Sequence, residues 1–404
     1  MNKIELLAPA KDLEKAKIAI MYGADAVYVG GKSFSLRSRA SNFSISDLKN
    51  LVEYAKFYNA KVYVTVNIVF HDEDFYGIKE YLRTLEAIGV NAIIVSSPAV
   101  ISLVKSVAPE LECHVSTQMS VVNSGAVHFL EEVGVDRVIL GRECPMSDIE
   151  QICAKCMTPI EVFIHGGMCS NYSGRCILSN RMTNRDANRG GCAHSCRWKY
   201  DVYEGKEKIS LDDCPFSMSS KDLRASAYVE RMIKAGVASL KIEGRMKSEY
   251  YLAQVVRTYR RMIDEIYKEG SLSKERIAYY DEELSKAENR PSDDGFLSGM
   301  ADNSKHLYGV NGAGVTHDYV AYVLGYDSMR SMALVEVKNR FSVNDELEAF
   351  GPYLENRRFT NKVMFKEDMT NISLANQPTE RVFIRTPFPL HKHDMIRRVR
   401  YDED

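Results

Sequence analysis

The fold is decided by the stretch Leu13–Val29, which reads LEKAKIAIMYGADAVYV. It contains a helical pattern that ends at Gly23, followed at once by a short apolar run rich in valine. Glycine suits the left-handed backbone conformation just past a helix end, and runs rich in β-branched residues are typical of strands. The same order recurs at Gly89, Gly134 and Gly236. Helices that alternate with strands in this way indicate βα units and a parallel sheet.

Eight such strands are expected in residues 1–270. The eight βα units fit a closed (β/α)8 TIM-like barrel, with an open doubly wound sheet as the alternative. No GxGxxG motif follows the first strand, which disfavours a dinucleotide-binding sheet. The expected strands are Ile4–Leu7, Ala26–Val29, Val62–Val69, Ala92–Val95, His114–Gln118, Val138–Leu140, Glu161–Ile164 and Ser239–Ile242. The expected helices include Leu13–Tyr22, Ser46–Phe57, Phe75–Ile88, Gly125–Val133 and Ala225–Ala235.

Beyond the barrel repeat, the sequence predicts two further parts. A cysteine-rich insertion, 166–238, follows the seventh strand, and barrel active sites form at the C-terminal ends of strands. Residues 271–314 are expected to be a helix and a polar linker, and 315–404 a small antiparallel β-barrel-like domain. The strands expected in that domain are Tyr319–Leu324, Ala333–Lys338, Asp345–Phe350, Lys362–Phe365, Arg381–Arg385 and Met395–Val399.

Composition narrows the class of protein. The 404 residues carry 53 Lys and Arg against 55 Asp and Glu, a net charge of −2, with 45% hydrophobic residues. These values are those of a globular protein and exclude wholesale disorder. No run approaches the length of about 18 apolar residues that a membrane span needs. The start lacks an apolar signal core, so a cytoplasmic protein is expected. The neutral total disfavours a general nucleic-acid binder, and the oligomeric state stays open.

Four cysteines form the central chemical motif. All nine cysteines of the chain lie between positions 113 and 214, and four of them have the spacing C-x6-C-x15-C-x3-C. Four thiolates on a loop-rich segment can bind zinc or hold an iron–sulfur cluster. Zinc favours shorter paired spacings, so the wide first spacing favours iron–sulfur, while zinc remains the alternative. The four cysteines are Cys169, Cys176, Cys192 and Cys196.

The same segment is locally basic and aromatic. Between Cys169 and Tyr200 there are six Lys and Arg residues and one Asp, a local charge of +5. Arginine contacts phosphate and aromatic rings stack on unpaired bases, so Arg175, Arg197 and Trp198 are candidate RNA contacts. The alternative is that these arginines only neutralise an anionic cluster.

Polar residues at predicted strand ends are expected to face the barrel mouth, where binding and catalysis occur in this fold. Arginine forks match carboxylates, so a pocket for a small anionic metabolite is expected there. Glu161 begins its strand and is expected to support the fold. The candidate catalytic residues are His165, Glu143, Glu243 and Arg245, the candidate pocket residues are Arg37, Arg39, Asn67 and Gln118, and His114 is expected to face the same mouth.

One further motif is the C-x2-C pair Cys153 and Cys156 on an expected helix. By itself such a pair indicates a redox motif. It lacks a Trp-Cys-Gly-Pro context, so two partly buried thiols are the favoured interpretation. Cys113, Cys144 and Cys214 are expected to be structural.

The run Glu161–Ser179 resembles the signature of the collagenase-like peptidase family, number thirty-two among peptidases of unknown catalytic type. Gly167 stands where that family usually has Ser or Ala. The resemblance extends over most of the chain. Its other blocks are Gly23–Tyr28 with Asn42–Phe43, Ser219–Leu223, Lys241–Lys247, and Asn339–Phe341 with Asp345–Glu348.

This resemblance implies a function. The family is similar to RNA hydroxylases and quinone hydroxylation factors that carry a four-iron four-sulfur cluster, which implies that the four spaced cysteines are its ligands. The subgroup of this length resembles tRNA hydroxylases, which form 5-hydroxyuridine at the wobble position and depend on prephenate. The linker Asn289–Phe296 departs from the Thr-rich version expected of that subgroup. The alternatives are a peptidase, although HExxH is absent, and a zinc or iron–sulfur RNA-binding assembly factor without catalysis.

Overall fold

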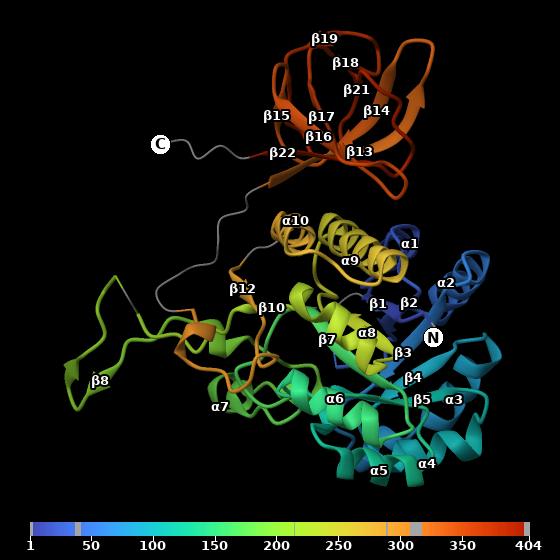
Figure 1. Ribbon diagram of the computed structural model, residues 1–404, viewed down its shortest axis with the longest axis vertical. Helices are drawn as coiled ribbons and strands as arrows, with labels where there is room; N and C mark the ends of the chain where they lie inside the picture. Colours follow the sequence, from blue (N-terminus) through green and yellow to red (C-terminus); the bar gives the residue numbers. More distant parts are fainter. Residues whose placement is uncertain (1–2, 37–41, 214, 288–289, 308–316, 400–404) are drawn as a thin grey trace.

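The structure is a computed structural model that describes residues 3–36, 42–213, 215–287, 290–307 and 317–399. Figure 1 shows an α/β body with a β-domain at one end of its long axis, and two long helices lie between them. These helices are α9, Glu249–Glu269, and α10, Lys274–Ser285. In the described part of the chain no helix is both long and apolar enough to cross a membrane.

The body is a closed barrel of eight parallel strands. Each strand pairs with the next along the sequence, and the eighth, β11, pairs with both β1 and β7. This closure confirms the predicted barrel, and the open-sheet alternative is wrong. The strands are β1 Glu5–Pro9, β2 Ala26–Gly30, β3 Lys61–Val66, β4 Ala92–Val95, β5 Glu112–Val115, β6 Arg137–Ile139, β7 Ile160–Gly166 and β11 Ser239–Ile242.

Helices surround the barrel, and several of them begin at a capping side chain or end at a glycine. Ser44 caps α2 through a capping box with Asp47, and Gly236 ends α8 with a φ of 84°. Oxygen caps of this kind satisfy the first backbone N–H groups of a helix. The helices before α9 are α1 Leu13–Met21, α2 Ile45–Phe57, α3 Ile78–Ala87, α4 Pro98–Val107, α5 Ser124–Glu132, α6 Met146–Lys155 and α8 Val229–Ala235.

A charged network closes the barrel interior near the start of its strands. The buried Glu161 carboxylate accepts hydrogen bonds from Lys241 Nζ at 2.7 Å and Arg137 at 3.0 Å. Glu161 therefore supports the fold, as expected. The prediction that His114 faces the mouth is wrong: its ring is fully buried against Tyr63, with centroids 4.8 Å apart. Because β5 ends at Val115, His114 is an inner residue of the strand and not its terminus.

The segment between β7 and α8 interrupts the barrel pattern. It contains α7, Leu178–Thr183, and a small hairpin of β8, Tyr203–Glu204, and β9, Glu207–Lys208, which extends away from the body in Figure 1. The chain returns through β10, Asp222–Arg224, which pairs antiparallel with β7 and parallel with β12, Ser292–Asp293. β7 ends at Gly166 and α8 begins at Val229, so the predicted insertion, 166–238, includes the barrel helix α8 as well as this segment.

The C-terminal domain is an eight-stranded antiparallel sheet with its own buried core. All six predicted strands are present in it. The sheet strands β17 and β19 and the separate pair of β15 and β20 were not predicted; β17 begins with two exposed arginines, and the other three have two residues each. The strands are β13 His317–Asp327, β14 Met332–Val337, β16 Glu346–Phe350, β17 Arg357–Thr360, β18 Met364–Lys366, β19 Asn371–Ile372, β21 Arg381–Arg385 and β22 Met395–Val399, and β15 Phe341–Ser342 pairs separately with β20 Leu374–Ala375.

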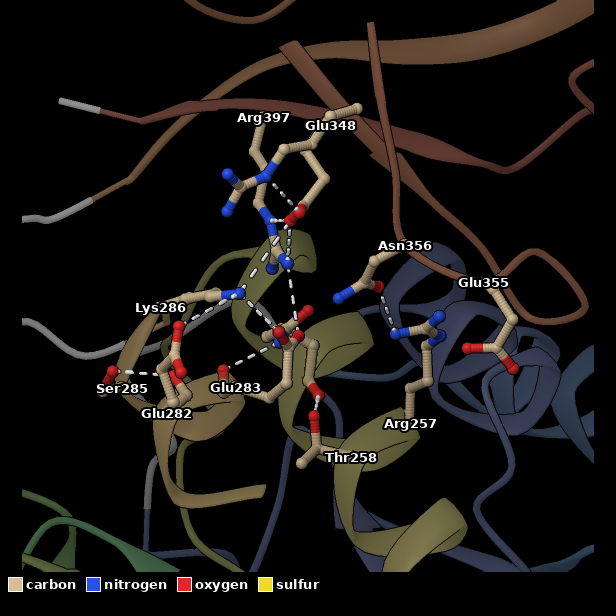
Figure 2. A network of polar contacts seen from close by, with 12 residues as sticks. Arg257, Thr258, Glu282, Glu283, Ser285, Lys286, Glu348, Glu355, Asn356 and Arg397 are labelled. Carbon is tan, nitrogen blue, oxygen red and sulfur yellow. Dashed lines mark hydrogen bonds and ion pairs between the residues drawn. The ribbon is translucent and has the colours of Figure 1, made fainter. Parts of the chain in front are cut away.

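A buried ion network joins this domain to α9 and α10 (Figure 2). Arg397 is fully buried, and its Nε donates to Glu348 Oε2 at 2.7 Å while its Nη2 donates to Glu283 at 3.2 Å. Lys286 pairs with Glu283 at the end of α10. Beside this network, Arg257 of α9 donates to two backbone carbonyls of the loop after β16. Charged contacts therefore fix the domain against the barrel helices.

Candidate metal centre

A cavity of about 420 Å³ lies at the C-terminal ends of the barrel strands. Its wall includes Gln118 after β5, Arg142 after β6 and Met246 after β11. Leu36 after β2 also lines it, and the segment after β7 supplies the rest of the wall. All four cysteines of the spaced motif line this one cavity, namely Cys169, Cys176, Cys192 and Cys196. The structure therefore brings together residues that span 28 positions of sequence.

The first cysteine pair is held by contacts with neighbouring barrel loops. Ser173, between the two cysteines, donates its backbone N–H to Glu143 Oε1 at 2.8 Å and its hydroxyl to the same oxygen at 3.1 Å. Ser120 donates to the Ser173 carbonyl. Gly174 has a φ of +78°, and a Cβ at this position would collide with the Gln118 carbonyl. Only glycine adopts this turn easily so close to the backbone of another loop.

The second pair is tied to the first by side-chain hydrogen bonds to the backbone. Asn188 Nδ2 donates to the Cys176 carbonyl at 2.9 Å. The Ser179 hydroxyl accepts from the Ala193 N–H, beside Cys192, at 3.0 Å. Arg197, next to Cys196, donates to the Met168 carbonyl at 2.7 Å. The four thiols thus sit on one cross-connected frame.

The spacing of the sulfur atoms bears on the metal that the cysteines could hold. A single zinc ion holds its thiolates about 2.3 Å away, so tetrahedral ligands lie about 3.8 Å apart. Among the described residues, no three of these four sulfurs all lie within 4.8 Å of one another. The four thiols as they stand are therefore not gathered around one tetrahedral ion, and the identity of the metal stays a prediction.

Two groups modify the chemistry of the thiols. Asn171 Nδ2 donates to Cys176 Sγ at 3.4 Å. Loss of hydration raises the pKa of Cys169, and the nearby cation Arg142 acts in the opposite direction. A bound metal would favour the thiolate at this position.

Arg142 is a functional candidate that the sequence reasoning missed. Its guanidinium lies 3.9 Å from the centroid of the Phe163 ring, inside the barrel mouth. Within the described ranges it forms no ion pair with a carboxylate. The rule that strand ends carry function would have found it, because it follows β6 directly and precedes Glu143. An arginine stacked on an aromatic ring in a cavity is suited to bind an anionic group.

Three predicted catalytic residues have structural contacts outside the cavity lining. His165 is buried with Nδ1 3.3 Å from the Tyr259 hydroxyl, and burial lowers its pKa to about 3, so the ring is neutral near pH 7. Glu243 Oε2 accepts from the Gly167 N–H at 3.2 Å. Arg245 donates to Asn42 at 2.9 Å. A catalytic role for these residues stays a prediction.

The fourth predicted catalytic residue, Glu143, is closer to the cavity. Its Oε1 holds Ser173, whereas its buried Oε2 has no hydrogen-bond partner in the part of the chain that the structure describes. A buried carboxylate oxygen of this kind can accept a hydrogen bond from a bound molecule.

The predicted small-molecule pocket is only partly in place. Gln118 lines the cavity, and Asn67 Nδ2 donates to Ser116 Oγ at 3.3 Å beside it. Arg37 and Arg39 lie outside the described residues.

The residues predicted to contact RNA differ in how exposed their side chains are. Trp198 is 42% exposed and Arg175 is exposed, with its Nε donating to Ser120 Oγ at 3.2 Å. Arg197 is instead directed inward to Met168, because it connects the two halves of the cysteine segment. Arg197 therefore holds the segment together, and Arg175 and Trp198 remain on the surface.

Of the other cysteines that the structure describes, none lines the cavity. Burial raises the pKa of Cys113 and of Cys144 to about 12, which is typical of inert structural thiols. Cys153 and Cys156 are half-buried at the end of α6. Cys214 lies outside the described residues.

Comparisons with known proteins agree with this architecture. Residues 11–307 match the model of peptidase family U32, and residues 315–397 match that of its C-terminal domain. The tRNA hydroxylation protein P1 of Bacillus subtilis is 43% identical over 98% of this chain and 95% of its own length. The 23S rRNA 5-hydroxycytidine C2501 synthase of Escherichia coli is 38% identical over 68% of this chain and 41% of its own length. A collagenase of Porphyromonas gingivalis is 34% identical, covering 87% of each chain. The chain belongs to peptidase family U32.

Proposed function

We propose that this protein is an RNA hydroxylase that forms 5-hydroxyuridine at the wobble position of tRNA, in the cytoplasm and with a dependence on prephenate. Two relatives that are named for RNA hydroxylation, one of which aligns over almost the whole chain, support an enzyme of this class. The wobble position and prephenate come from the sequence resemblance and are the parts of the proposal that experiment must test.

The observation that carries the proposal is the meeting of four cysteines around one cavity at the barrel mouth. We propose a four-iron four-sulfur cluster on these cysteines as the resident cofactor, supported by their wide spacing in the sequence and by the finding that no three of their sulfurs, among the described residues, lie within 4.8 Å of one another. When bound, such a cluster supplies one-electron transfer. Asn171 would donate a hydrogen bond to one of its ligands, and Arg197 and Asn188 would hold the two cysteine pairs in register.

The polar groups of the cavity account for substrate binding in this proposal. Arg142 binds an anionic group, a carboxylate of prephenate or a phosphate of RNA, because its charge is not used by another described residue. Glu143 is a positioning residue in this proposal, because it holds Ser173 in the cavity wall. The neutral, buried His165 supports β7 against α9, where Tyr259 contacts it.

The surface around the cavity is suited to an unpaired base. Trp198 and Tyr172 are exposed beside the cysteines, and their rings offer stacking area. Arg175 provides a cation on the same surface. Recognition of a loop nucleotide needs this combination of stacking and phosphate contact more than a uniformly positive protein. The total charge of −2 is therefore compatible with an RNA substrate.

Proteolysis is the second candidate, and it is supported by the relative named collagenase. A cysteine peptidase needs a thiol with a histidine in reach, and in this cavity the thiols are proposed as cluster ligands. Replacement of these cysteines should therefore abolish RNA modification if the protein is a hydroxylase, and protein cleavage if it is a cysteine peptidase.

The test is nucleoside analysis of tRNA from a strain that lacks this gene and its U32 paralogues. Wobble 5-hydroxyuridine derivatives should disappear, return with the wild-type gene, and stay absent with a Cys169→Ala and Cys176→Ala double variant. Cys144→Ala, a buried thiol away from the cavity, serves as the matched control and should restore modification. Unchanged 5-hydroxyuridine in the deletion strain would contradict the proposal, and a double variant that still cleaves collagen would contradict both this function and a cysteine peptidase at this site.

A further inference from the structure

A second group of metal-binding side chains lies far from the cysteine cavity. It comprises His128 and Glu131 of α5 and Cys156 directly after α6. One nitrogen, oxygen or sulfur atom from each residue lies within 4.8 Å of the others, and no other group of three such residues does so within the described ranges. The ends of α5 and α6 precede β6 and β7, so the group lies on the barrel face opposite the mouth.

The histidine in this group is already oriented. His128 Nδ1 lies 2.7 Å from Glu131 Oε2. Glu131 Oε1 accepts from the N–H groups of Met157 at 2.6 Å and Thr158 at 2.7 Å, which fixes the carboxylate. With its Nδ1–H donated to Glu131, the ring presents the lone pair of Nε2, and Cys156 Sγ lies 4.0 Å from that atom. Histidines that bind metals commonly donate their other nitrogen to a carboxylate in this way.

A second thiol lies close by in the sequence. Cys153 lies three residues before Cys156, in the last turn of α6, whereas Cys156 is the extended residue that ends the helix. The Cys153 sulfur is not one of the atoms of this group that lie within 4.8 Å of one another. Both thiols are free and half-buried. A C-x2-C pair with a histidine from a neighbouring element is the spacing that zinc sites use. The spaced motif of the large cavity lacks any C-x2-C pair, so the two sites differ in their sequence pattern as well as in position.

We propose that His128 and Cys156 bind a zinc ion, with Cys153 as a further ligand once its thiol turns toward them, and with Glu131 as the positioning residue of the histidine. Zinc ligands at about 2.0 Å from nitrogen and 2.3 Å from sulfur lie about 3.6 Å apart in tetrahedral geometry. The separation of 4.0 Å between Nε2 and Cys156 Sγ is close to this value. The ion would connect α5 to the end of α6. On the face of the barrel opposite the mouth, such a link stabilises the fold and takes no part in catalysis.

The test is the metal content of the whole protein, purified from cells grown with added zinc, with iron and zinc measured together. The wild type should hold about one zinc ion per chain in addition to its iron. His128→Ala and Cys156→Ser should each lose most of the zinc while the iron stays unchanged. Glu132→Gln, an exposed neighbour on the same helix, is the matched control and should keep the zinc. All three positions lie at the surface or half-buried, and circular dichroism checks that each variant folds.

Two results would overturn the zinc site. The first is wild-type protein with only trace zinc, or with a Cys153–Cys156 disulfide in most molecules by mass spectrometry. The second is zinc that remains bound in both His128→Ala and Cys156→Ser, which would place the ion on the four cysteines of the cavity. Iron and zinc are measured in the same sample, so a missing cluster and a missing zinc site are distinguished.

Discussion

Replacement of Arg397 by methionine should loosen the C-terminal domain from the barrel. Arg397 is fully buried and is the main partner of the Glu348 and Glu283 carboxylates (Figure 2). Methionine keeps the packing on Phe350, whose ring centroid is 4.8 Å from the guanidinium. It leaves two buried carboxylates with Lys286 and the more exposed Arg358, which pairs with Glu348, as the cations that remain beside them. Removing one partner of a buried ion pair costs about 3–5 kcal/mol. We expect the lower end, about 3 kcal/mol, because Lys286 still compensates one charge.

The assay is urea unfolding followed by circular dichroism, with Arg385→Met as the control because Arg385 is exposed on the same sheet. The acid dependence gives a second measurement. The cations Arg397 and Lys286 outweigh burial and lower the folded-state pKa of Glu283 to about 2. A depressed carboxyl pKa contributes stability above the unfolded value of about 4.3, and that contribution is lost as the pH falls toward about 2. The deficit of the variant should therefore shrink on acidification. A loss below about 0.5 kcal/mol at pH 7, the range of ordinary surface changes, or a deficit that does not depend on pH, would refute this reasoning.

Three further predictions concern the cavity. Arg142→Met should abolish most wobble modification in the complemented deletion strain and leave the iron content of the protein unchanged. Arg142→Lys should retain part of the activity because it keeps a cation near Phe163. Loss of iron in Arg142→Met would instead assign Arg142 a structural role. Asn171→Leu removes the N–H that Asn171 donates to Cys176. Hydrogen bonds to sulfur stabilise the reduced state, so this variant should lower the reduction potential of the cluster in a redox titration. An unchanged potential would contradict a role of Asn171 in tuning the cluster. Trp198→Ala should weaken binding of an anticodon stem-loop by about 1–3 kcal/mol, the value of one stacked base, and equal affinity would remove Trp198 from the RNA surface.

The fold could be predicted from the sequence because its signals are local. The barrel strands are short β-branched runs, and four of the eight follow a helix that ends at a glycine, so both features are visible within one βα unit. β17 escaped prediction because Arg357 and Arg358 resemble a loop, although the strand is paired with β16 on one side. A charged strand at the edge of a sheet owes its extended conformation to the strand it pairs with. That pairing cannot be read from the residues of the edge strand itself.

The site was predictable in its metal ligands and less so in its polar residues. Cysteine spacing identified the four residues that share the cavity. The orientation of a side chain depends on elements far away in sequence, and His165 illustrates this, since its partner Tyr259 lies 94 residues later. Arg197 appeared available for RNA, but Met168 and Ser219 bind it. These contacts form only when the segment after β7 closes on itself.

The central claim is that the four cysteines of the cavity hold an iron–sulfur cluster, and metal analysis of anaerobically purified protein tests it most directly. The protein should be brown, absorb broadly in the visible range and contain about four iron and four sulfide ions per chain. All three properties should be lost when Cys169 and Cys176 are both replaced by alanine. Colourless wild-type protein that holds zinc on these cysteines, contains no iron and still restores wobble modification would contradict the account.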